Sequence, residues 1–217
     1  MLRRHKFTRT WNKADDQSAQ MKAMTDEEVR KWCPQAGLKA MRYDILRYKQ
    51  KREHKFFITA PEEHREILFL ARTILIFRDE AQFSGGLLWL QQWNIGSPPL
   101  VWSGWCILEN MRRAHGDPRS LEIAPAQSFR EDEIVELHVF LVQVVAFGWR
   151  ADYIPFLGKF FLHFKPNRQI CVTAKSPETL KELRAHFQQW NPTDEDPMLV
   201  KMAAMEKARK KAGSGLK

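Results

Sequence analysis

The chain has 217 residues, of which 44% are hydrophobic and 28% charged, and its formal net charge is +9. Such a composition is typical of folded globular proteins, so a wholly disordered, collagen-like or coiled-coil chain is excluded. No uncharged apolar run approaches the roughly 18 residues that a membrane span needs, and we therefore expect no membrane association. The length suits one globular domain with extensions.

Cysteine usage and the start of the chain both indicate a reducing compartment. The first nine residues are basic, but Trp-Asn-Lys-Ala-Asp-Asp follows at 11–16 in place of the apolar stretch of a secretory signal. Cys33, Cys106 and Cys171 are widely separated and form no C-x-x-C pair, which argues against a disulfide framework or a Cys-rich zinc site. We expect a cytoplasmic protein with no cofactor and no metal site.

Positive charge is concentrated in a few segments. Residues 1–13 and 201–217 each carry a net charge of +5, and residues 30–55 carry +7. Basic segments beside a mildly acidic body suit the binding of phosphates or of an acidic partner, although basic ends also keep a chain soluble. The basic residues that we select as candidate binding residues are Arg42, Arg47, Lys51, Arg52, Lys207, Arg209, Lys210 and Lys211.

The N-terminal quarter is expected to be an arm followed by helices. Residues 1–24 are polar and lack periodicity, which predicts a mobile arm. Thr25 and Glu28 form a capping box that opens a helix, and this helix must end before the next proline. Residues 38–55 then place apolar side chains at helical spacing among lysines and arginines. We interpret 25–55 as a helical basic extension.

The segment 56–192 is predicted to form the globular domain. Strict alternation on both sides of the turn at 165–168 indicates a β-hairpin. The elements expected along the segment are a strand at 56–59, helices at 61–75 and 104–115, a strand at 121–124, a helix from Ser128 to Gly148, strands at 150–156, 160–164 and 170–174, and a helix at 176–190.

The resulting fold class is a single α+β domain. A mixed, partly antiparallel sheet that includes the C-terminal hairpin is expected to pack against several amphipathic helices. Basic helical extensions are expected at both ends, the second being a helix and tail at 193–217.

One pair of side chains is a candidate for acid–base chemistry. The sequence contains no phosphate-binding glycine loop, nucleophile elbow or H-E-x-x-H motif. His163 lies mid-strand on the face opposite its apolar neighbours, and Asp152 on the neighbouring strand could approach it. Such a pair can transfer protons, or it can be an ordinary cross-strand contact at the surface. The pattern identifies no nucleophile.

A tryptophan-rich segment is the candidate recognition surface. Trp89, Trp93, Trp102 and Trp105 lie within residues 89–105. Tryptophan stacks well on bases, sugars and partner side chains, but it also anchors loops onto a core. Both interpretations remain open.

Together these patterns predict a cytoplasmic binding protein. Its basic segments would hold nucleic acid or an acidic protein surface, and its tryptophan-rich segment would recognise the partner. Two alternatives remain: a protein–protein adaptor or inhibitor built on the tryptophan surface, and an enzyme of unassigned class at His163 and Asp152.

Overall fold

The fold combines one large antiparallel sheet with helices, which confirms the predicted α+β class. A computed structural model describes residues 22–41, 46–49, 54–77, 85–92, 98–197, 199–200 and 202–205, and for residues 98–105 it describes the backbone alone. Within these residues, no helix has the length and apolar character needed to cross a bilayer.

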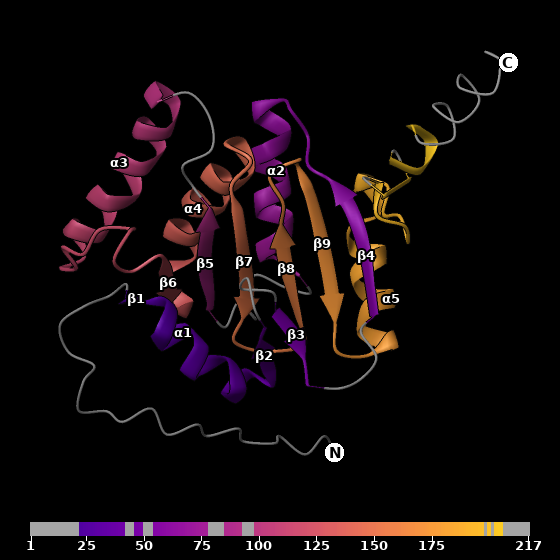
Figure 1. Cartoon of the computed structure of the whole chain (residues 1–217), viewed down its shortest axis with the longest axis horizontal. Helices are drawn as coiled ribbons and strands as arrows, with labels where there is room; N and C mark the ends of the chain where they lie inside the picture. Colours follow the sequence, from indigo (N-terminus) through magenta and orange to yellow (C-terminus); the bar gives the residue numbers. More distant parts are fainter. Residues whose placement is uncertain are drawn as a thin grey trace, which may run out of the picture.

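The sheet has seven strands in the order β1-β6-β5-β7-β8-β9-β4. Each neighbouring pair is antiparallel, whereas the sequence predicted a mixed sheet that is antiparallel only in part. Its strands are β1 (Lys22–Met24), β4 (His54–Thr59), β5 (Gly86–Gln92), β6 (Ala126–Phe129), β7 (Arg150–Pro155), β8 (Phe160–Phe164) and β9 (Gln169–Ala174). A separate ribbon pairs β2 (Leu38–Ala40) with β3 (Leu46–Tyr48). Figure 1 shows the sheet face-on, with the ribbon near its lower end.

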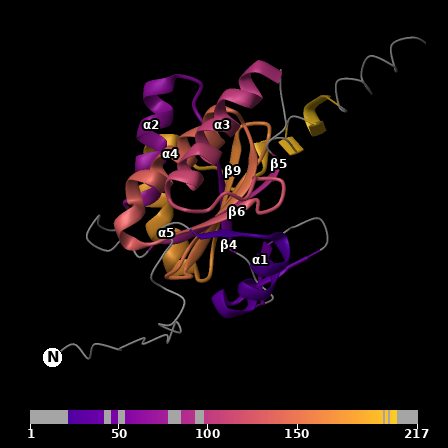
Figure 2. The ribbon, with the colours of Figure 1, turned by 90° about the vertical axis from the view of Figure 1, so that its left-hand side faces the viewer.

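Helices lie on both faces of the sheet. They are α1 (Asp26–Trp32), α2 (His64–Leu75), α3 (Pro98–Ala114), α4 (Ile134–Ala146) and α5 (Pro177–His186), with the short 3-10 helices η2 (Cys33–Ala36), η5 (Glu131–Glu133) and η6 (Gln188–Trp190). Figure 2 shows α2, α4 and α5 on one side of the sheet and α1 on the other. The structure is therefore three-layered where α1 lies.

The strands supply two separate apolar cores, because successive side chains of a strand point to opposite faces. The larger core lies between the sheet and the helices of the α2 side. The smaller core lies under α1, η2 and the ribbon, and its sheet side chains are Leu87, Trp89, Ala126, Ile154 and Phe161. The covering layer contributes Val29, Trp32, Cys33, Leu38, Leu46 and Tyr48 to this smaller core.

Several local predictions are confirmed. The hairpin of β8 and β9 pairs Phe164 with Ile170 across the predicted turn, and β7 is the predicted neighbouring strand. The capping box is present: the Thr25 hydroxyl accepts from the Glu28 backbone N–H at 3.2 Å, and the Glu28 carboxylate accepts from the Thr25 N–H at 2.7 Å.

The prediction of a basic helix over 38–55 is wrong. Its described residues form β2, β3 and the start of β4. The interpretation of 25–55 as a separate extension also differs from the structure, because α1 and the ribbon pack on the sheet through the smaller core. Residues 22–24, expected at the end of a mobile arm, form strand β1 and pair with β6, whereas residues 1–21 lie outside the described part of the chain. Apolar residues three to four apart matched a helix, but the strands alternate instead: Leu46 and Tyr48 are buried and Arg47 between them is exposed.

Two expectations between α3 and α4 also need correction. Residues 121–123 form a turn, and the strand lies later, in β6. Ser128 belongs to that strand and does not cap α4. The carboxylate of Glu133 accepts from the Arg130 backbone N–H at 2.8 Å, so the helical segment begins two residues later than its sequence suggested.

Each edge of the sheet is closed by a specific contact. At β1, the Asp117 carboxylate accepts from the Ala23 N–H at 3.3 Å, and the Arg119 guanidinium donates to the Ala23 carbonyl at 2.8 Å. At β4, Thr193 exchanges two backbone hydrogen bonds of 2.8 Å with Phe57. An open strand edge can pair with other chains, and these contacts occupy the pairing groups of both residues.

Replacing Asp117 with Asn should destabilise the fold by about 1–3 kcal/mol, because a buried acceptor of several hydrogen bonds is lost. Hydrogen bonds from Arg119 hold the pKa of Asp117 below its ordinary value of 3.8. The ionised carboxylate therefore contributes stability above that pH, and the contribution is lost as the pH falls below it.

Denaturant unfolding of the Asp117→Asn variant and the parent from pH 7 to pH 3 measures this effect. The difference between them should be largest near neutral pH and shrink in acid. The exposed Glu122 provides the control, Glu122→Gln, which should match the parent throughout. A difference that is independent of pH would contradict the role assigned to the ionised carboxylate.

Candidate functional site

A row of directly opposed side chains crosses the sheet on the face that α1 partly covers. Backbone register places these residues next to one another on β5, β7, β8, β9 and β4. In that order the members of this cross-strand row are Trp89, Asp152, His163, Cys171 and Phe57. The row runs along the border of the smaller core, with Trp89 inside that core.

Asp152 is the buried carboxylate of the row. Its exposed fraction is 0%, whereas the His163 side chain is 21% exposed. One carboxylate oxygen, Oδ1, lies 2.8 Å from His163 Nδ1, and the other, Oδ2, accepts from the Gln91 amide. A carboxylate without partners at this depth would be strongly destabilising. These two contacts stabilise the buried carboxylate of Asp152, and one of its two partners, the imidazole of His163, is partly exposed to solvent.

The bond to Asp152 orients the imidazole of His163. An ionised carboxylate only accepts hydrogen bonds, so Nδ1 carries the proton and Nε2 of the neutral ring is the free base. The proximity of Asp152 to His163 that the alternation predicted is present in the structure. Their use in catalysis remains a prediction. Asp152 is more deeply buried than expected of an exposed sheet face, because α1, η2 and the ribbon pack on this side of the sheet. Burial raises the pKa of the Cys33 thiol in η2 to about 12, and the charge of Asp152 adds to that rise.

Cys171 lies on the other side of His163 and is a site residue that the sequence patterns alone did not indicate. Its thiol contacts the Thr173 hydroxyl at 3.8 Å. Burial raises the pKa of the Cys171 thiol, and hydrogen bonding to Thr173 together with the charges of Lys55 and Lys165 works against that rise. Cys171 could have been identified from the sequence, because the predicted hairpin turn places position 171 opposite position 163.

Two lysines border the row on its β4 side. Lys55 Nζ and Lys165 Nζ lie 5.9 Å and 5.1 Å from the ring centre of Phe57, within reach of a cation–π contact. Lys165 also pairs with Asp196 at 2.6 Å. Although carboxylate, imidazole and thiol are neighbours here, no group of three or more His, Cys, Asp or Glu side chains in the described part of the chain is placed to hold a metal ion.

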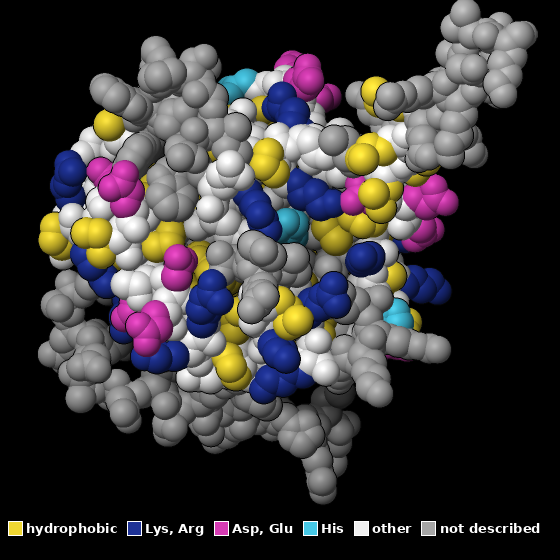
Figure 3. Space-filling model, in the orientation of Figure 1, with side chains coloured by type: hydrophobic (Ala, Val, Ile, Leu, Met, Phe, Trp, Pro, Cys, Tyr) yellow, Lys and Arg dark blue, Asp and Glu magenta, His cyan; other side chains and the backbone are white. Residues whose placement is uncertain are grey.

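Further basic side chains lie on the β2–β3 ribbon, which packs on the same face of the sheet as the row. Lys39 and Arg47 are opposed in the β2–β3 ribbon and point away from the smaller core, and neither has an ion-pair partner among the described residues. Like charges in opposed positions destabilise a strand pair, so the fold does not explain their presence. Figure 3 shows Lys and Arg side chains over the middle and lower part of this face.

Only one of the predicted basic binding residues falls within the described structure. Arg47 lies on the ribbon surface. The others, namely Arg42, Lys51, Arg52, Lys207, Arg209, Lys210 and Lys211, lie outside the described residues.

The tryptophan segment does not form one recognition surface, because Trp89 is in the core. Its exposed fraction is 0%, and its indole N–H donates to Asp26 Oδ1 at 2.7 Å. Trp89 shares the strand face of Leu87 beneath α1, which accounts for its burial. Trp93 lies outside the described residues, as do the side chains of Trp102 and Trp105.

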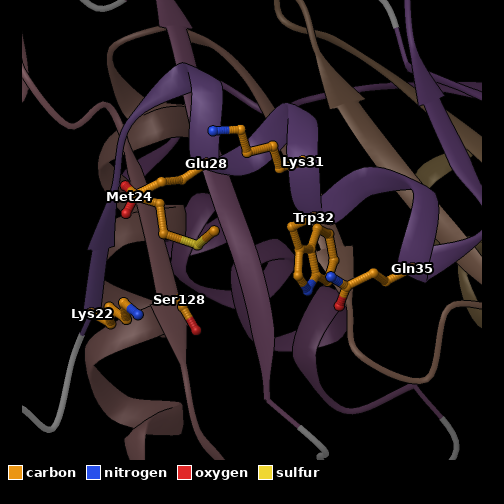
Figure 4. A pocket seen from close by; sticks show the side chains of 7 residues that line it. All are labelled: Lys22, Met24, Glu28, Lys31, Trp32, Gln35 and Ser128. Carbon is orange, nitrogen blue, oxygen red and sulfur yellow. The ribbon is translucent and has the colours of Figure 1, made fainter. Parts of the chain in front are cut away.

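A pocket of about 200 Å³ lies between α1 and the β1–β6 edge. Figure 4 shows its lining, formed by Lys22, Met24, Glu28, Lys31, Trp32, Gln35 and Ser128. The Glu28 carboxylate is already used by the capping box, and Lys31 pairs with Glu27 at 2.7 Å. Because these two charges are satisfied within α1, the pocket is a weaker candidate for a ligand site than the cross-strand row.

No protein-family model, curated protein or solved structure matches this chain.

The bond between Trp89 and Asp26 should be needed for the α1 layer to hold. Replacing Asp26 with Ala leaves the buried indole N–H without its acceptor and should cost about 1–3 kcal/mol of unfolding free energy. The companion substitution Trp89→Phe removes the donor. If the bond accounts for the cost, Asp26→Ala should cost much less in the Trp89→Phe background than in the parent.

Chemical denaturation of the four proteins in this cycle supplies the measurement. Glu27→Ala, on the same exposed helical turn, is the matched control and should leave the denaturation midpoint nearly unchanged. Additive effects of the two substitutions would show that the hydrogen bond does not stabilise the layer.

Proposed function

We propose that the protein binds nucleic acid through the basic surface on the α1 side of the sheet, with the basic terminal segments as additional contacts. The observation that carries this proposal is the pair formed by Lys39 and Arg47. Two cations held side by side on a rigid ribbon, with no ion-pair partner among the described residues, suit contacts with successive phosphates.

The distribution of charge over the two sides of the sheet supports the proposal. On the α1 side, Lys49 and Lys55 are exposed in addition to the ribbon pair, whereas the charges of α1 itself nearly cancel: Asp26, Glu27 and Glu28 against Arg30 and Lys31. The helices α2, α4 and α5 of the opposite side are balanced in charge, because Glu66, Glu136, Glu178 and Glu182 are matched in number by Arg65, Arg72, Lys181 and Arg184. A molecule with one basic side orients a polyanion toward that side during encounter.

The two edges of the sheet are poorly suited to binding a partner peptide as an additional strand, which favours binding through phosphate contacts. Asp117 with Arg119 at β1, and Thr193 at β4, already occupy the pairing groups of the central residues of both edge strands. A partner peptide that adds a strand to the sheet would have to displace these contacts.

Reversing the charge of the ribbon pair should weaken nucleic-acid binding. The double variant Lys39→Glu/Arg47→Glu should bind labelled single- and double-stranded oligonucleotides at least about tenfold more weakly at moderate salt. If each residue contacts one phosphate, the slope of log K against log salt should become less steep by about 1.5–2. Fluorescence anisotropy at several salt concentrations measures both quantities.

The matched control makes the same change of net charge on the helical side. Arg65 and Lys181 are exposed there, and Arg65→Glu/Lys181→Glu should bind nearly as well as the parent. Equal weakening by the two double variants would contradict a defined basic surface. Competition by polyglutamate as strong as competition by oligonucleotide would instead point to an acidic protein as the partner.

A further inference from the structure

We propose that Cys171 is a nucleophile, that His163 accepts its proton, and that Asp152 positions His163, so that the cross-strand row transfers acyl groups from small anionic esters or thioesters. The three residues are neighbours on β7, β8 and β9 in the order carboxylate, imidazole, thiol. This is the order in which a base-activated nucleophile, its base and an orienting group work together. The proposal does not depend on nucleic-acid binding.

The bond to Asp152 turns the free nitrogen of the His163 imidazole toward β9. Nδ1 of His163 faces β7, where it contacts Asp152 at 2.8 Å. The two ring nitrogens lie on different edges of the imidazole, so Nε2 is directed away from β7. The next strand in that direction is β9, and its residue opposite His163 is Cys171. Opposed side chains in an antiparallel pair have Cβ atoms about 4.5–5.5 Å apart.

The thiol of Cys171 can turn toward the imidazole by one bond rotation. In the structure Cys171 Sγ contacts Thr173 Oγ1. Rotation about the single Cα–Cβ bond of cysteine, between staggered positions, can turn Sγ from Thr173 toward His163. Burial raises the pKa of Cys171, so the thiol is protonated near neutral pH and needs a base before it can attack. His163 is the imidazole in the opposed position.

Two lysines near Cys171 favour a negatively charged substrate. Lys55 and Lys165 both lie over the ring of Phe57, which is opposite Cys171 on β4. Lys165 is paired with Asp196, while the exposed Lys55 has no ion-pair partner among the described residues. An acyl compound with a carboxylate or phosphate group would place that group at Lys55 and its carbonyl carbon at Sγ.

The proposed reaction consumes only the ester or thioester and water. His163 Nε2 takes the proton of the Cys171 thiol while Sγ forms a bond to the acyl carbon. The bond from that carbon to the leaving oxygen or sulfur breaks, and the leaving group takes the proton from His163. Water then attacks the thioester, gives one proton to His163 and forms the carboxylic acid, and Sγ recovers its proton. No atom changes its oxidation state.

The test uses the full chain and two probes, the anionic ester mono-(4-nitrophenyl) succinate and the neutral ester 4-nitrophenyl acetate. Release of nitrophenolate gives the rate, and peptide mass spectrometry locates the acyl group. The exposed Cys106 is an internal reference thiol in the same molecule. At pH 7 Cys171 should be acylated roughly 100-fold faster than Cys106, the size of effect expected of a positioned base.

Substitutions separate the roles. His163→Gln should remove that advantage, and Cys171→Ala should abolish the fast release of nitrophenolate. Lys55→Gln should slow the reaction of Cys171 with the anionic ester more than its reaction with the neutral ester. Acylation of Cys106 in preference to Cys171, or a Cys171 rate that His163→Gln does not alter, would overturn the proposal.

A measurement on the unaltered protein covers the case in which His163→Gln does not fold. The groups that face Cys171 are His163, Thr173, Lys55 and Lys165, with Asp196 behind Lys165. If His163 is the base, the acylation rate of Cys171 should level off below the pH at which a free thiol ionises, about 8.5. A rate that keeps rising beyond pH 8.5 would show a thiol that ionises alone and would reject the assignment.

Discussion

Because successive residues of a strand point to opposite faces, a sheet that is apolar on both faces must be covered twice. Most strands of this sheet meet that condition, and both covering layers follow from it. The α2 side is covered by long helices. The opposite side is covered by α1, η2 and the ribbon, which come from the N-terminal segment and are tied to the sheet by the bond between Trp89 and Asp26. The extent of this second layer decides which part of the sheet face lies in the apolar core.

The border of that layer explains the electrostatics of the cross-strand row. Asp152 lies where the cover is complete, so its charge is stabilised by direct partners and not by water. His163, one strand further on, is partly exposed. A carboxylate in a low-dielectric setting holds an imidazole in one orientation more firmly than the same pair at the surface could. The gradient of burial along the row therefore gives each member a different chemical environment.

Folding places basic side chains that are far apart in the sequence next to one another. Lys39 and Arg47 lie eight residues apart in the sequence, yet the ribbon register places them opposite each other. Lys55 and Lys165 are still further apart in sequence, and both lie over Phe57. Strand pairing thus brings basic side chains from short, separate segments together on one side of the sheet. A net charge of +9 alone would not have located that surface.

The sequence by itself determined the elements that are specified by a local pattern, such as alternation over several residues or a capping box. The β8–β9 hairpin, the capping box of α1 and the approach of Asp152 to His163 all follow from alternation or capping within a few residues. Cys171 could have been found from the same hairpin register. The three-residue strands of the ribbon could not, because they are too short for a period of two to be told from a helical one. The burial of Trp89 depends on a contact with Asp26, 63 positions away, and long-range contacts of this kind leave no local pattern. Tertiary packing alone decided which residues lie in the core and which charges share a surface.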